Sequence, residues 1–95
     1  MAGKTDGVAE LVRVILQTLP KPYGEDIIED VFVAIEHNPN WFKRYQELGT
    51  ELKQVWIVNN WIGQHTKAQI GYDTIREVDT TRTKLAKSYS KLRRP

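Results

Sequence analysis

The stretch that decides the fold lies near the middle of the chain, at residues 25–40, and reads EDIIEDVFVAIEHNPN. Its apolar residues recur at the spacing of one helical face, namely Ile27, Ile28, Val31, Phe32 and Ile35. Acidic residues crowd the start of that face, where carboxylates interact favourably with the positive end of a helix dipole. Asn38 and Pro39 then end one helix and start the next, because Asn caps a helix and Pro fits its first turn.

A first helix is predicted upstream of this stretch. Six apolar residues follow a single helical face there: Val8, Leu11, Val12, Ile15, Leu16 and Leu19. Asp6 is placed to cap the start of this helix, and Pro20 ends it because proline cannot continue a helix. The chain therefore begins with an amphipathic helix followed by a turn.

Downstream, the pattern predicts a short third helix that starts near Trp41 and ends at Gly49. Thr50 then caps a fourth helix, which we expect to extend from Glu51 to about Gln69. A last helix is predicted from about residue 80 to Leu92, with a narrow apolar stripe. The β-branched run at 55–58 also fits a strand, and residues 72–78 lack helical periodicity, so strand structure is an alternative in these two places.

The resulting prediction is an all-α protein, a small bundle of about five helices. Residues 1–95 are too few for a second core, so we expect a single helical domain. Within it, residues 80–95 would form a basic C-terminal helix or tail. The 40% apolar content is sufficient for one compact core.

Composition excludes several classes of function. The chain contains no cysteine, which rules out disulfide scaffolds, thiol nucleophiles and cysteine-based zinc sites. The two histidines, His37 and His65, are not at metal-ligand spacing, and no nucleophile–base pattern or phosphate-binding glycine loop is present. We therefore expect no enzymatic activity, cofactor, metal or small-molecule substrate. The polar N-terminus and the lack of a long apolar run predict a cytoplasmic protein that does not enter membranes.

Charge is distributed unevenly along the chain. Residues 1–40 hold three basic and seven acidic residues, whereas residues 41–95 hold eleven basic and five acidic residues. Between Thr80 and Pro95 there are six basic residues and no acidic residue. One interpretation is a polyanionic partner for the second half. The other is mutual attraction of the two halves, within the fold or across a dimer.

Residues 41–69 have the outline of a helix-turn-helix, with a short helix, a glycine turn and a longer helix. Leu48, Gly49, Val55 and Val58 meet the requirements of that motif. Tyr45 occupies a position that usually takes a small residue. Arg44 occupies one that usually takes an apolar residue. A plain αα-hairpin with a polar surface is the alternative interpretation.

Two groups of residues are candidates for nucleic-acid contact. On the fourth helix we predict exposed Lys53, Gln54, Asn59 and Asn60, since Asn and Gln can pair with adenine and Lys with guanine or phosphate. At the C-terminus, the candidates for phosphate contact are Lys84, Lys87, Lys91, Arg93 and Arg94. A solvated tail is the alternative for the second group. Of the tryptophans, Trp61 is the one predicted to be exposed.

The function predicted from these features is that of a small non-enzymatic binding protein, with nucleic acid, specifically DNA, as its partner. The alternative is a protein-interaction or adaptor module, as a homodimer or with a partner protein. Such a module would use the acidic helix 25–36 and the basic helix 80–94 as complementary faces.

Overall fold

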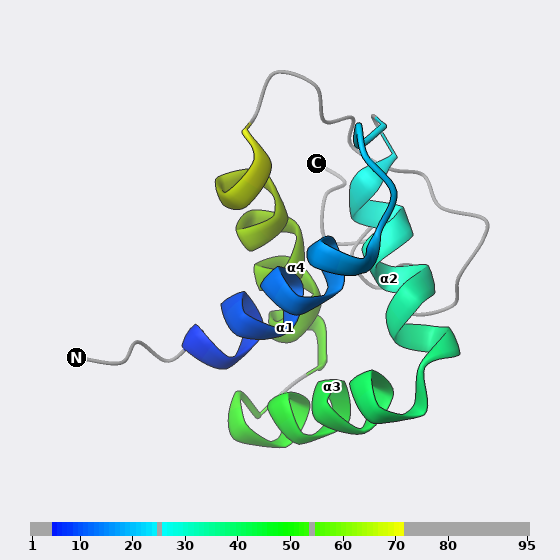
Figure 1. The fold of residues 1–95 in the computed structure, drawn as a ribbon. Coiled ribbons are helices and arrows are strands. Elements are labelled where there is room, and N and C mark those ends of the chain that lie inside the picture. Colours follow the sequence, from blue (N-terminus) through cyan, green and yellow to red (C-terminus); the bar gives the residue numbers. More distant parts are fainter. Residues whose placement is uncertain (1–4, 25, 54, 72–95) are drawn as a thin grey trace.

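The computed structural model describes residues 5–24, 26–53 and 55–71, and all regular secondary structure within them is helical. Four helices follow one another along the chain: α1 (Asp6–Thr18), α2 (Ile27–His37), α3 (Pro39–Glu51) and α4 (Val55–Ile70). The first and last of them cross, α2 stands beside this pair, and α3 lies across one end (Figure 1). The predicted all-α bundle is confirmed at this level, whereas the fifth helix at 80–92 lies outside the described residues.

The core is formed by all four helices, and α1 packs most extensively against α4. The predicted apolar faces of α1 and α2 point inward, with only Leu19 less than fully buried. The buried apolar residues are Val8, Leu11, Val12, Ile15, Leu16, Ile27, Ile28, Val31, Phe32, Ile35, Tyr45, Leu48, Val58 and Ile62. In the described part of the chain, no helix is long and apolar enough to cross a membrane.

The junction between α2 and α3 forms as the sequence predicts. Asn38 adopts an extended backbone, and its Oδ1 accepts hydrogen bonds from the backbone nitrogens of Asn40 (3.0 Å) and Trp41 (3.1 Å). These amides would otherwise lack a partner at the start of the helix. Pro39 occupies the first helical position, where its missing N–H removes no hydrogen bond.

The predicted turn at Gly49 is wrong. Helix α3 continues through a buried Gly49 and an exposed Thr50 to Glu51, and Thr50 Oγ1 donates to Gln46 O (3.4 Å) within the helix and caps nothing. Glycine costs only about 1 kcal/mol inside a helix, and packing of α3 against its neighbours outweighs that preference. The turn comes later, at Lys53, which has a φ of 75°.

The start of α4 settles the alternative interpretation of 55–58. These residues form the first turn of α4, so the strand that their β-branched side chains allowed is not formed. The other end of α4 agrees with the prediction. Gly71 has a φ of 98°, and its nitrogen donates to Lys67 O (2.9 Å), as in a typical glycine helix end.

Replacing Asn38 with Ala tests the cap of α3. We expect Asn38→Ala to lower the free energy of unfolding by about 1 kcal/mol, because the two amide hydrogen bonds to its side chain are lost. Asn40→Ala is the matched control, since Asn40 is exposed and uses only its backbone nitrogen at this junction. Urea denaturation of the two variants measures the difference. Equal stability of both variants would contradict the capping role.

Candidate functional site

Helix α4 packs against α1, α2 and α3, and most extensively against α1. Its inner side consists of residues at positions 58, 59, 62, 63 and 66, which are all buried. Two of these are polar and fully buried, Asn59 and Thr66. The hydroxyl of Thr66 donates to Ile62 O within the helix (2.7 Å). The other polar residue reaches across to α3.

Asn59 is fixed by a buried hydrogen bond between helices. Tyr45 Oη on α3 donates to Asn59 Oδ1 at 2.7 Å, and the two residues are 3% and 0% exposed. Burial raises the pKa of Tyr45 to about 12, while the Asn59 contact opposes that rise. The phenol therefore stays protonated and remains a donor at neutral pH. Asn59 is thus part of the core, and its predicted exposure on a nucleic-acid-binding surface is wrong.

The opposite side of α4 forms an outer face that the other described helices leave partly or fully exposed. Each residue on this face has another three or four positions away along the chain, as one helical side requires. Its members are Ile57, Asn60, Trp61, Gln64, Lys67 and Ala68. Amide groups from Asn60 and Gln64 lie one turn apart, next to the large apolar ring of Trp61. The outer face therefore combines hydrogen-bonding groups with an aromatic surface.

Lys53 stands at the turn that precedes α4. It is exposed, and its positive φ turns the chain between α3 and α4. The neighbouring carboxylate of Glu51 is engaged by Arg44, whose Nη1 lies 2.9 Å from Glu51 Oε2. That contact raises the pKa of Arg44, chiefly through the Glu51 hydrogen bond. Among the described residues, no ion pair involves Lys53, so its charge faces solvent at this end of α4.

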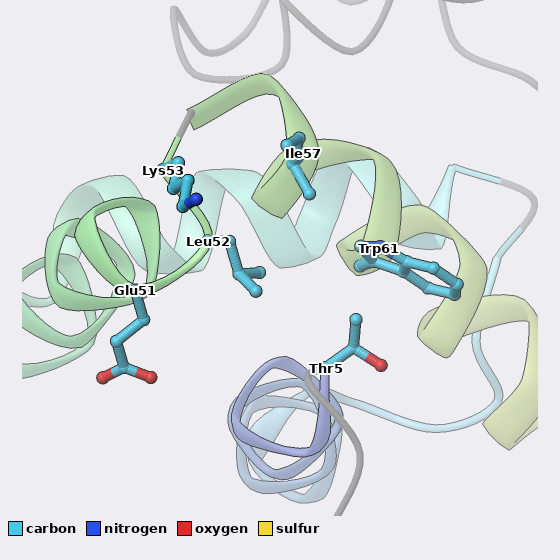
Figure 2. Close-up of a pocket in the computed structure, with 6 residues that line it drawn as sticks. All are labelled: Thr5, Glu51, Leu52, Lys53, Ile57 and Trp61. Atoms are coloured by element: carbon cyan, nitrogen blue, oxygen red, sulfur yellow. The ribbon is translucent and has the colours of Figure 1, made fainter.

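A hollow of about 640 Å³ opens between this turn and the start of α1. Its lining comes from the residue just before α1, from the end of α3 and the turn after it, and from the first two turns of α4: Thr5, Glu51, Leu52, Lys53, Ile57 and Trp61 (Figure 2). Leu52 and Ile57 supply apolar walls. The side chains of Trp61 and Thr5 lie near each other at the end of the hollow away from Glu51 and Lys53. This volume falls in the range of small-ligand sites, about 300 to 1,000 Å³.

Trp61 is 37% exposed, the only large hydrophobic side chain in the described residues that is classed as exposed. Its ring contacts that of His65, with centroids 5.6 Å apart and planes tilted by 35°. His65 is in turn held at the N-terminal end of α1, because its Nε2 lies 3.1 Å from Oγ1 of Thr5, the residue before that helix. Burial lowers the pKa of His65, although the charge of Asp6 acts in the opposite direction. A neutral imidazole therefore supports one side of the tryptophan.

The structure keeps some of the predicted contact residues on one surface and separates others. Lys53 is exposed and Asn60 is half-buried at the outer face, while Asn59 points into the core. Gln54 and the five C-terminal candidates lie outside the described residues. Sequence reasoning missed Gln64, Lys67 and the hollow. The period of α4 could have identified the first two, because they follow Asn60 by four and seven positions.

Charge on the described bundle is nearly balanced. It carries six basic and eight acidic residues, so the basic excess of the chain comes mainly from residues 72–95. Two of these cations are in ion pairs: Arg13 pairs with Glu10, and Arg44 pairs with Glu47 and Glu51. Within the described ranges, no group of three or more His, Asp or Glu side chains is arranged to hold a metal ion.

Comparison with known proteins finds no family model, no curated protein and no solved structure that matches this chain.

Tyr45→Phe tests the buried bond between α3 and α4. The variant deletes the donor but leaves the acceptor buried, so we expect the free energy of unfolding to fall by about 1–3 kcal/mol. Tyr23→Phe is the matched control: Tyr23 Oη donates to Leu16 O (2.6 Å) in a half-buried position, where water can replace the hydroxyl. Denaturant titration of both variants measures the difference. A larger loss in Tyr23→Phe would contradict the central role of the Tyr45 contact.

His65 predicts a pH dependence of stability. Its folded-state pKa lies below the unfolded value of about 6.5, so the unfolded chain takes up the proton first. Stability should be complete above pH 6.5 and fall as the pH drops from there toward the folded-state pKa. Thermal melting between pH 7.5 and pH 5 measures this slope. His65→Gln should flatten the slope and the exposed His37→Gln should preserve it; identical slopes in all three proteins would refute the assignment.

Proposed function

We propose that the protein binds nucleic acid, with DNA as the first candidate, through the outer face of α4 and the basic C-terminal segment (residues 80–95). The observation that carries this proposal is the pair of amides on the outer face of α4, Asn60 and Gln64, on a helix that follows the solvent-facing charge of Lys53 at its preceding turn. Amide side chains on a helix surface can form paired hydrogen bonds with adenine, while lysine can contact guanine or phosphate.

The arrangement of α3 and α4 supports a helix-turn-helix-like use of these residues. A turn centred on Lys53 separates the two helices, and the Tyr45–Asn59 hydrogen bond fixes the side of α4 that faces outward. The pair departs from the usual motif because Gly49 lies inside α3, and because Tyr45 fills a place usually taken by a small residue. In this proposal α4 is the helix that approaches the bases.

Affinity would come chiefly from the basic C-terminal segment. The described bundle has slightly more acidic than basic residues and offers little electrostatic attraction for phosphates. Residues 80–95 contain six basic residues and no acidic residue, among them Lys84, Lys87, Lys91, Arg93 and Arg94. Contacts of lysine and arginine with phosphates release counterions, which makes such binding strongly dependent on salt.

The alternative, a protein-interaction module with α2 as its acidic face, has weaker support. Glu29 is only 6% exposed, and Asp26, Asp30 and Glu36 are half-buried. Helix α2 contributes mainly to the core, so it offers little acidic surface to a basic partner.

Salt-dependent DNA binding tests the proposal. Fluorescence anisotropy with a labelled duplex should show binding at 50 mM salt that weakens steeply by 200 mM. Replacing the five C-terminal candidates with Gln should reduce the slope of log K against log salt by about four. A duplex that binds no better at low salt than at physiological salt would refute duplex DNA as the partner.

A matched pair of single substitutions locates the contact surface. Lys53→Gln at the α3–α4 turn should reduce the slope by about one. Lys21→Gln removes the same charge from the loop between α1 and α2 and should leave the slope unchanged. Equal effects of the two substitutions would show that the turn before α4 is not part of the binding surface.

A further inference from the structure

We infer that the hollow beside Trp61 binds one unstacked base of a single-stranded nucleic acid, with the base against the indole ring and an adjoining phosphate near Lys53. This inference rests on the proposed function and specifies its ligand as an unpaired strand. It uses the lining of the hollow and the exposed ring, neither of which is required by readout of a duplex groove.

The first support is the position of the indole ring. Trp61 exposes a large apolar surface on the outer face of α4, at the edge of the hollow (Figure 2). Aromatic rings exposed on a surface are well suited to stack on nucleic-acid bases, and every base has a π face. Stacking on such a ring tolerates different sequences and requires that the base be unpaired or displaced from a duplex.

The second support is that the ring is held in place before any ligand arrives. His65 contacts the ring on one side, and Thr5 holds His65 by the contact between Oγ1 and Nε2. Gln69 Nε2 also donates to Ala9 O (3.0 Å), which fastens the end of α4 to α1. A ring that is already oriented loses less conformational entropy when a base stacks on it.

The third support is the charge around the hollow. Glu51 is one of its lining residues, but its carboxylate is paired with Arg44 on α3. Lys53 lies at the same rim and forms no ion pair within the described part of the chain. The hollow therefore offers a cation, Lys53, and an aromatic ring, Trp61. These two groups suit a ligand with a planar apolar part joined to an anionic part. A nucleotide within a strand has these properties.

The fourth support is the presence of hydrogen-bonding groups next to the ring. Asn60 immediately precedes Trp61, and Gln64 lies one turn further along the same outer face. Amides can donate to and accept from the edges of an unpaired base. The hollow itself, at about 640 Å³, is of the size that holds small organic groups.

The test compares three labelled probes at the same low salt concentration: a 12-nucleotide oligothymidylate, an abasic deoxyribose-phosphate strand of equal length and charge, and a 12-base-pair duplex. If the hollow binds a base, oligothymidylate should bind the full-length protein several-fold more tightly than the abasic strand. It should also quench tryptophan fluorescence, whereas the abasic strand should not.

Three substitutions of Trp61 separate stacking from other contributions. We expect Trp61→Ala to weaken oligothymidylate binding by about 5- to 150-fold, the range for loss of one stacked base. Trp61→Leu should lose a similar amount because it keeps apolar bulk without a π face, whereas Trp61→Phe should retain most of the affinity. Because Trp61 is partly exposed, these variants should fold, and circular dichroism checks that they do.

Each contrary result has a distinct meaning. If the duplex binds but the base-containing and abasic strands bind equally, and Trp61→Leu has no effect, this inference is wrong while the proposed function stands. If none of the probes binds at low salt, both are wrong. If Trp61→Leu alters only the sedimentation of the protein by itself, the hollow is an interface between copies of this chain and the inference is overturned.

Discussion

The buried hydrogen bond from Tyr45 Oη to Asn59 Oδ1 joins α3 to the inner side of α4 and, together with the buried Val58 and Ile62, fixes how α4 is oriented in the bundle. In a low-dielectric interior each of these groups would be costly to leave without a partner, so the two helices must meet where the pair can form. Once Asn59 points inward, Asn60, Trp61 and Gln64 follow on the outward side. The candidate binding surface is thus the side of α4 opposite its buried polar and apolar residues.

Much of the fold could be predicted from residue spacing, and the exceptions have physical causes. Apolar periodicity identified α1 and α2, and Asn38 with Pro39 identified the junction to α3. The intrinsic preference of Gly49 predicts a turn, but burial of this residue within α3 overrides that preference. The polarity of Asn59 predicts a surface position, although Ile62 and Thr66, three and seven positions later, mark its side of α4 as buried.

The candidate site could be predicted only in part because it is assembled from distant segments. Lys53 and the exposure of Trp61 were predicted from local sequence, and both lie at the hollow. The contribution of Thr5 depends on α1 crossing α4, which no local pattern shows. The hollow and the amide groups of the outer face thus belong to the four-helix bundle, while the excess of basic residues in the chain lies mainly in residues 72–95.

The packing of the first described helix against the last has a consequence for synthesis. Thr5 meets His65 and Ala9 meets Gln69, so each contact joins residues 60 positions apart. During translation α1 leaves the ribosome long before α4 exists to cover its apolar face. The nascent chain must carry that face uncovered through the synthesis of α2 and α3, and the native bundle can close only after α4 has emerged.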